Sequence, residues 1–270
     1  MRATSPGVHL LSRPRVIESL IRGSGVGPGD LVIDFGAGPG TLTAPLAATG
    51  ARVLAIERDD AFVRALRRRF ADRPSVRVVH SDLRSVRLPR RDFAVVSSIP
   101  FAVSTPLLRR LLSPVPGRLT TADLVVEWGL ARRLAATRPR DLESAWWAAR
   151  FELRLARRIP ARCFVPAPAV DAAHLSVRRR PGLDSRASAV LWTLLGAVYR
   201  RPAVPARHVL GDLLGDRAAH RFARRVLREL GADPSEPAAS VQVGVWARVA
   251  VGLAADRGVV APRLPRALRA

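Results

Sequence analysis

The 270-residue sequence contains no lysine, so all 45 of its basic residues are arginines. It has one methionine, one tyrosine and a single cysteine, Cys163. A lone cysteine excludes an intramolecular disulfide and any zinc site built from several cysteines. The sequence has no run of about 18 apolar residues that would span a membrane, and its first residues lack the apolar stretch of a signal peptide. We therefore expect a cytoplasmic protein that makes no use of a membrane.

Acidic residues are also few: 22 Asp and Glu leave a net charge of +23. Both halves share the excess, with +14 over residues 1–178 and +9 over residues 179–270. A charge of this size favours a polyanionic partner, nucleic acid first and an anionic membrane second. The alternative is a basic surface that only keeps the protein soluble.

Alternating strand and helix patterns fill the first two thirds of the chain. Continuous apolar runs at 31–35, 52–57, 76–82, 93–100 and 122–128 are typical of buried strands. Residues 151–159 and 173–180 alternate as a closing antiparallel pair would. Helical spacing separates most of these runs, which predicts an α/β fold with a doubly wound, mostly parallel, seven-stranded sheet.

Beyond about residue 180, helical patterns dominate, at 188–201, 206–214, 217–230 and 240–253. We expect an α/β domain over 1–180 and a small all-α domain over 181–256. The basic, proline-containing tail, 257–270, is predicted to be disordered.

A glycine-rich turn, Asp34-Phe35-Gly36-Ala37-Gly38-Pro39-Gly40, follows the first strand. Its spacing differs from the G-x-G-x-x-G fingerprint of dinucleotide sites, and a carboxylate before the first glycine suits a cationic amino-acid group better than a pyrophosphate. Glu57 ends the next strand, where a carboxylate can accept both hydroxyls of a ribose. Asp82 ends the third, where it can accept from an adenine amine. Three acids at the edge where such sheets bind ligands predict a site for S-adenosylmethionine.

The fourth strand ends in Ser98-Ile99-Pro100-Phe101. Phe101 is suited to stack on an extruded base. The Ser98 hydroxyl and the Ile99 carbonyl are suited to accept the two hydrogens of an adenine amine, which would aim its lone pair at the methyl donor. The alternative is a strand that simply ends in a proline turn.

Spaced prolines stiffen the segment from Phe164 to Asp171. This loop either presents Phe164 as a second wall of a base slot or is purely structural, and the motif alone favours the structural interpretation. The arginine runs 67–69 and 178–180 are either solvated or contact phosphates. His80, His174, His208 and His220 lack ligand spacing, so no metal site is expected.

Together these motifs resemble the rRNA adenine N6-dimethyltransferases, the family of the Erm and KsgA enzymes. DFGAGPGTLT, SIPFAVSTPLLRRLL and FVPAPAVDAAHLSVRRR carry the resemblance, which covers residues 8–180. It implies a Rossmann-like class I methyltransferase domain, S-adenosylmethionine as methyl donor, rRNA as partner and a monomer. It also implies an N-terminal arm that closes over the cofactor and a C-terminal domain that helps to bind rRNA.

EWGLARRLAA and the arginine-rich tail are more similar to Erm. That resemblance implies transfer of one or two methyl groups to an adenine of 23S rRNA, and resistance to macrolides, lincosamides and streptogramin B. The alternatives are a KsgA-like 16S rRNA dimethyltransferase and an rRNA-binding homologue with little activity.

The expected site residues follow from the strand-edge pattern and the resemblance. Catalysis is assigned to Ser98, Ile99, Pro100 and Phe101, and base binding to Phe101 and Phe164. The cofactor is expected to contact His9, Leu11, Asp34, Gly36, Ala37, Gly38, Glu57, Arg58, Asp82, Leu83 and Ser98.

Two departures from the family pattern stand out. The arm reads Val8-His9-Leu10-Leu11, where the family usually has Gln, then Asn or His, then Phe-Leu. Ser98 stands where the family usually has Asn. Serine keeps an acceptor but is shorter and lacks the amide, so we expect slower chemistry or mostly monomethylation.

Overall fold

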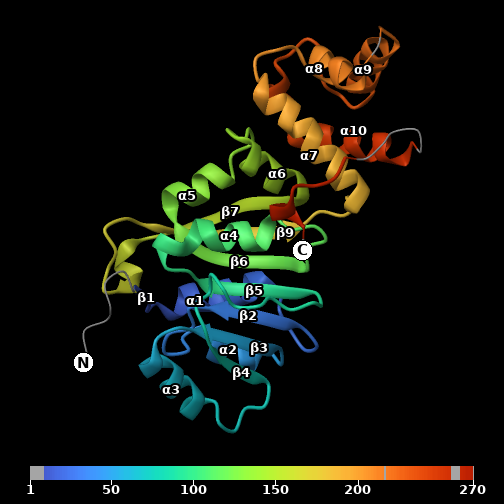
Figure 1. Cartoon of the computed structure of the whole chain (residues 1–270). Coiled ribbons are helices and arrows are strands. Elements are labelled where there is room, and N and C mark those ends of the chain that lie inside the picture. The colour runs from blue at the N-terminus through green and yellow to red at the C-terminus, as the bar shows by residue number, and fades with distance from the viewer. Residues whose placement is uncertain (1–8, 216, 257–261, 270) are drawn as a thin grey trace. The chain divides into compact units, whose positions relative to one another are not determined.

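A computed structural model describes residues 9–215, 217–256 and 262–269 (Figure 1). The chain divides into two compact units. The sheet unit comprises residues 1–112, 118–135 and 153–179, and the helical unit comprises 113–117, 136–152 and 180–270.

The sheet unit is built on seven strands in the order β4-β3-β2-β5-β6-β9-β7 (Figure 1). The strands are β2 (Leu31–Phe35), β3 (Arg52–Glu57), β4 (Val76–His80), β5 (Phe93–Ser98), β6 (Leu119–Glu127), β7 (Phe151–Ile159) and β9 (Ala172–Arg179). The pairs from β4 to β6 are parallel, whereas β9 runs antiparallel to β6. The predicted α/β fold with a mostly parallel, seven-stranded sheet is therefore confirmed.

Helices of the sheet unit follow its strands along the chain. They are α1 (Pro14–Ser24), α2 (Thr43–Ala48), α3 (Asp60–Arg69), α4 (Ser104–Leu112) and α5 (Trp128–Leu134). Acidic side chains fix two of their starts, because Asp59 accepts from the first amides of α3 and Glu127 from those of α5. Helices α3 and α5 therefore begin at a defined point after the strands that precede them.

Buried charges join the last parallel strand to β9. Asp123 of β6 is almost fully buried, with its Oδ1 2.6 Å from His174 Nε2 and its Oδ2 2.8 Å from Arg178 Nη2. Since Asp123 pairs with Ser176, both partners lie two residues away on the same face of β9.

A second, two-stranded sheet was not predicted. β1 (Leu10–Leu11) pairs antiparallel with β8 (Phe164–Val165), which joins the N-terminal arm to the proline-rich loop. Two residues are too few to produce a periodic pattern, so the sequence carries no signal for this pairing.

The helical unit contains α6 (Leu142–Arg150), α7 (Ser185–Arg200), α8 (Ala206–Leu214), α9 (Arg217–Glu229) and α10 (Val243–Ala255). Helix α6 was not predicted, although Asp141 and Ser144 form a capping box at its start. Its two tryptophans, Trp146 and Trp147, are buried, and both indole N–H groups donate to Ser113. This burial explains why residues 136–152 and 113–117 belong to the helical unit, in addition to the segment predicted from 181.

The predicted disordered tail is corrected for residues 262–269, whereas residues 257–261 and 270 lie outside the described part. Arg266–Leu268 form a 3-10 turn, and the side chain of Leu268 is buried. The Leu268 carbonyl accepts a hydrogen bond from the Val115 amide at 2.7 Å. An apolar anchor therefore overrides the basic, proline-containing composition. Within the described residues, no helix is long and apolar enough to span a bilayer.

Candidate functional site

The glycine turn lies where β2 ends. Gly36, Gly38 and Gly40 have φ values of 71°, 53° and 86°, a region that favours glycine. A Cβ at Gly36 would lie 3.5 Å from Cδ of Pro100, and one at Gly38 would lie 3.3 Å from Cδ2 of Leu10. The turn is thus within contact distance of the predicted catalytic segment on one side and of the N-terminal arm on the other.

The Glu57 carboxylate holds this turn against the end of β3. Its Oε2 accepts from Gly38 N at 2.9 Å, and its Oε1 accepts from Arg58 N at 2.7 Å and from Asp59 N at 2.9 Å. A carboxylate oxygen accepts about two hydrogen bonds, so Oε2 has room for one more donor. This geometry leaves Oε2 able to accept from a ribose hydroxyl, and the expectation that Glu57 accepts from both hydroxyls stays a prediction.

Asp34, at the end of β2, is buried beneath the turn. Its Oδ2 accepts a hydrogen bond from the Thr43 hydroxyl at 2.7 Å, and only 1% of the residue is exposed. Burial, together with the nearby charge of Glu57, raises the pKa of Asp34 from 3.8 to about 7. A cation bound beside the turn would favour the ionised form.

Asp82 lies at the end of the third strand as predicted, but an arginine engages its carboxylate. Arg84 Nη2 donates to Asp82 Oδ2 at 2.6 Å, and Arg84 Nε donates to Oδ1 at 3.0 Å. These bonds lower the pKa of Asp82 to about 2. An adenine amine would have to compete with this ion pair for the carboxylate. The next residue, Leu83, is buried, and its carbonyl accepts from Arg110 of α4.

The predicted catalytic segment begins at the end of β5. Ser98 is half-buried, and Ile99 is buried with its amide donating to Val125 O at 3.0 Å. The preceding Ser97, not singled out from the sequence, is fully buried and accepts from Phe35 N at 2.8 Å. The two adjacent serines therefore differ: Ser97 ties β5 to β2, and Ser98 lies at the ligand edge.

The N-terminal arm brings a second set of residues to this edge. The Leu10 side chain lies against Gly38, whereas the Leu11 side chain is buried in the core, because alternate residues of a strand face opposite sides. Only the backbone of Leu11 can therefore contact a cofactor. The His9 ring lies 6.2 Å from the Phe101 ring, centroid to centroid.

Phe164 does not have the position expected of a base-slot wall. It is 3% exposed and packs in the same core cluster as Leu11, its partner across β1 and β8. The proline-rich loop thus buries its aromatic ring and uses its backbone to hold the arm, which corrects the prediction.

These residues fit S-adenosylmethionine. Side chains at Gly36 and Gly38 would fill the space between the turn, Pro100 and the arm, so the glycines leave a cradle for a ligand. One Glu57 lone pair is available to a hydroxyl, and the carboxylate of Asp34 lies beneath the turn, where it favours a cation. Within the described part of the chain, no three His, Cys, Asp or Glu side chains gather to hold a metal ion.

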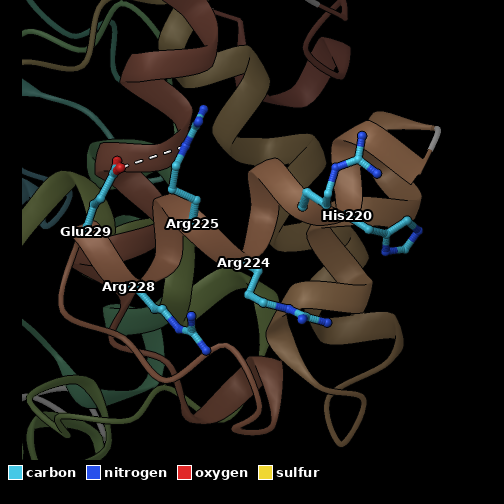
Figure 2. Close-up of a pocket in the computed structure, with 6 residues that line it drawn as sticks. His220, Arg224, Arg225, Arg228 and Glu229 are labelled. Carbon is cyan, nitrogen blue, oxygen red and sulfur yellow. Dashed lines mark ion pairs between the residues drawn. The ribbon is translucent and has the colours of Figure 1, made fainter.

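A separate basic surface lies on α9 of the helical unit (Figure 2). Ala223 and Leu227 are buried, while the opposite face is exposed and lines a depression of about 360 Å³. We call this face the α9 ridge; it consists of Arg221, Arg224, Arg225, Arg228, His220 and Glu229. Glu229 is the one acidic residue of the ridge, and its Oε1 lies 3.8 Å from Nε of Arg225.

Comparisons with known proteins show the family of the chain. Residues 3–229 match the family described as ribosomal RNA adenine dimethylase. An rRNA adenine N-6-methyltransferase of Bacillus licheniformis is 32% identical over 182 residues, 66% of this chain and 63% of the relative. The mycinamicin-resistance protein MyrB of Micromonospora griseorubida is 35% identical over 80% of this chain and 68% of its own length. The ribosomal RNA small subunit methyltransferase A of Thermobifida fusca is 30% identical over 90% of this chain and 88% of its own length.

The crystal structure of the 23S rRNA methyltransferase ErmE shares the fold, with a TM-score of 0.75 and 23% identity over 89% of this chain and 98% of that one. The arrangement of the sheet and its helices is that of the class I methyltransferase fold. More specifically, the chain belongs to the ribosomal RNA adenine dimethylase family. The match spans just under two thirds of the length of the Bacillus relative.

The raised pKa of Asp34 makes a pH-dependent contribution to stability. Between pH 3.8 and about 7 the folded state keeps the Asp34 proton and the unfolded state loses it. Stability is therefore lost as pH rises through this window, by up to about 1.4 kcal/mol per pH unit. In Asp34→Asn, which keeps an acceptor for Thr43, we expect this loss to disappear. Urea unfolding of the wild type and of Asp34→Asn between pH 3.8 and about 7 measures this loss of stability. Asp72→Asn, at an exposed position, is the control. Parallel pH profiles for the wild type and Asp34→Asn would contradict the raised pKa of Asp34.

Proposed function

We propose that the protein transfers one or two methyl groups from S-adenosylmethionine to the N6 of an adenine in 23S rRNA. It acts in the cytoplasm as a monomer and confers resistance to macrolides, lincosamides and streptogramin B. The observation that carries the proposal is the meeting, at one sheet edge, of the glycine turn, the Ser98–Phe101 segment and the N-terminal arm. The resistance role is supported by the mycinamicin-resistance relative.

Each part of the edge has a task in this reaction. S-adenosylmethionine supplies an electrophilic methyl group on its sulfonium. The cradle of Gly36, Ala37 and Gly38 receives it, and Glu57 accepts one ribose hydroxyl. Phe101 stacks on the target base. The Ser98 hydroxyl and the Ile99 carbonyl accept the two amine hydrogens, which turns the nitrogen lone pair toward the methyl group.

No strong general base is required. An adenine amine becomes acidic only once it is methylated, so its proton leaves after the new bond forms. The rate therefore depends on positioning, which explains why the edge presents a hydroxyl, a carbonyl and a ring.

The direct test incubates the purified protein with methyl-labelled S-adenosylmethionine and protein-free 23S or 16S rRNA, followed by nucleoside analysis. We expect label in 23S rRNA as N6-methyladenine or N6,N6-dimethyladenine. Label only in 16S rRNA, or only in small-subunit particles, would overturn the 23S assignment.

That second outcome would support a KsgA-like 16S rRNA dimethyltransferase. The specific observation in its favour is the small-subunit methyltransferase of Thermobifida fusca, which matches nearly the whole chain. No label in any RNA, with RNA and cofactor both bound, would instead indicate an rRNA-binding homologue with little activity.

Ser98 is expected to limit the reaction. Its hydroxyl is shorter than the asparagine amide usual in the family, so an amine that already carries one methyl is held less firmly. We expect Ser98→Asn to increase the rate or the dimethyl fraction, measured as the ratio of the two nucleosides over time. The control is Ser98→Ala, which removes the acceptor and should lower both; an unchanged rate and ratio in Ser98→Asn would contradict this role.

The helical unit is proposed to bind rRNA through the α9 ridge. Arg221, Arg224 and Arg228 are exposed and, among the described residues, have no acidic partner within ion-pair distance. They repeat at i, i+3 and i+7, so their guanidinium groups lie along one side of the helix. Such a row suits the phosphates of an RNA backbone, which bind arginine without regard to sequence.

We expect Arg224→Gln combined with Arg228→Gln to weaken rRNA binding and to flatten its salt dependence. On single-stranded RNA, the slope of log Kd against log salt should fall by about 0.7 for each phosphate that the variant no longer neutralises. The turnover rate at saturating RNA should not change. Arg67→Gln with Arg68→Gln, an exposed pair on α3, removes the same charge as a control; equal weakening by both pairs would mean that net charge, and not the ridge, drives binding.

A further inference from the structure

A second aromatic residue follows the sheet at the edge where the Ser98–Phe101 segment lies. Strands β5 and β6 are parallel, with Ser98 level with Val125. Phe101 and Trp128 each come three residues after this pair. Neighbouring strands lie about 4.8 Å apart, so the two chain segments leave the sheet at adjacent points. We propose that Trp128 and Arg158 form a platform for a second RNA nucleotide, one that adjoins the target adenine. The inference rests on the proposed function and extends it from the target base to the strand that carries the base.

Asp171 holds both members of this platform. Its carbonyl oxygen accepts from the Trp128 amide at 3.0 Å, and its Oδ2 accepts from Arg158 Nε at 2.6 Å. Its Oδ1 accepts from the Ala161 amide at 2.8 Å, which fixes the carboxylate. The guanidinium carbon of Arg158 lies 5.2 Å from the centroid of the Trp128 ring, within the range of a cation–π contact. The two side chains are therefore placed together before any RNA binds.

Both side chains keep hydrogen-bond donors that the protein does not use. Three other tryptophans, Trp146, Trp147 and Trp246, donate their indole N–H groups to protein acceptors. Trp128 is half-buried, and its indole N–H has no acceptor among the described residues. The terminal nitrogens of Arg158 also have none in the described part of the chain, and 60% of this side chain is exposed. A nucleotide supplies what such a pair binds, because its base stacks on a ring and its phosphate accepts from a guanidinium.

The charges around the platform favour a phosphate. Arg154 lies on the same face of β7 as Arg158, because alternate residues of a strand share a face, and Arg162 follows that strand; all three are exposed. Two acids lie nearby, and backbone amides already bond to both. Glu127 accepts from the first amides of α5, and Asp171 accepts from the amide that follows Pro160. A phosphate at Arg158 therefore meets an excess of positive charge.

The platform lowers the cost of presenting one base alone. A base that leaves an RNA stack exposes the face of its neighbour, and this unstacking costs free energy. Stacking of the neighbour on Trp128 replaces the lost contact, and an aromatic ring accepts any base in this way. The neighbouring nucleotide then fixes the strand that holds the target adenine, so the amine meets the Ser98 hydroxyl in one geometry.

The test measures RNA affinity against salt concentration, with a fragment of 23S rRNA that contains the target adenine and with S-adenosylhomocysteine bound. We expect Trp128→Leu to weaken binding roughly tenfold at every salt concentration, since stacking on a ring is lost. The slope of log Kd against log salt should not change, because stacking releases no counterions. Trp128→Phe, which keeps a ring, should restore most of the affinity.

Arg158→Gln should have a different signature. We expect weaker binding together with a slope that falls by about 0.7, the value for one phosphate of a single strand. The matched control is Arg52→Gln, which removes the same charge from an exposed residue at the start of β3, the opposite edge of the sheet. It should leave the affinity and the slope close to those of the wild type.

A second readout locates the nucleotide. Two RNA fragments carry 2-aminopurine beside the methylated adenine, one on its 5′ side and one on its 3′ side. One of them should change fluorescence on binding to the wild type and to Trp128→Phe, and change less with Trp128→Leu. With 2-aminopurine at the methylated position itself, saturating amounts of all three proteins should give the same change.

Thermal unfolding and the affinity for S-adenosylhomocysteine check the fold of each variant. Trp128→Met, which also lacks a ring, takes the place of Trp128→Leu if that variant unfolds. Wild-type affinity in the ringless variant would overturn the inference, as would an unchanged slope in Arg158→Gln or an equal effect of Arg52→Gln. A response to Trp128→Leu only at the methylated position would place Trp128 at the target base and also overturn it. A wild type that binds the fragment but methylates no RNA would overturn the proposed function, and the salt titration would still test the platform.

Discussion

One carboxylate organises the ligand edge of this protein. Glu57 accepts hydrogen bonds from three backbone amides, one in the turn after β2 and two after β3. Charge-assisted bonds of this kind are stronger than those between neutral groups, and at 8% exposure little water is present to replace them. They fix Gly38, against which the side chain of Leu10 lies. The glycine cradle and the start of the segment after β3 are thus held by this one side chain.

The same edge concentrates negative charge in a protein of net charge +23. Asp34 and Glu57 are both buried there, and burial together with the charge of Glu57 raises the pKa of Asp34. A cationic ligand relieves this cost, whereas a free phosphate is repelled. In the proposed function, local and global charge therefore suit different ligands: the strand edge suits the sulfonium and ammonium groups of a methyl donor, and the arginine-rich surface suits the phosphates of RNA.

The sequence predicted the parallel strands well because those in the middle of the sheet are buried on both faces and are therefore continuous apolar runs, whereas the edge strand β4 is only partly buried. The predicted strands 31–35 and 52–57 match β2 and β3 in every residue. The sequence could not predict β1 and β8, because each has only two residues and therefore no period. It also could not predict α6, because the apolar and polar residues of that helix are irregularly spaced. The sequence also could not predict individual side-chain contacts. The burial of Phe164 by the arm joins distant segments, and the ion pair between Arg84 and Asp82 depends on the conformation of a loop.

The arginine run 178–180 donates to backbone carbonyls, whereas phosphate contact by the run 67–69 stays a prediction. Arg178 donates to the backbone carbonyls of Gly23 and Ala122, and Arg179 donates to that of Leu119. Both arginines stabilise the sheet unit, so their guanidinium groups are already occupied. The arginines of α9 are spaced by helical turns rather than adjacent in sequence, and only the helix gathers them on one face.

The division of the chain into two units implies a division of tasks. Every residue proposed to contact the methyl donor or the target base belongs to the sheet unit, whereas the α9 ridge belongs to the helical unit. Phosphate contacts carry no sequence information, so a ridge that binds rRNA as proposed raises the affinity for all rRNA alike. Stacking on Phe101 tolerates any base, so in the proposed reaction the choice of adenine depends on the Ser98 hydroxyl and the Ile99 carbonyl, which accept the two hydrogens of its amine. The proposal thus places selectivity in a few groups at one sheet edge and assigns affinity to the basic surface.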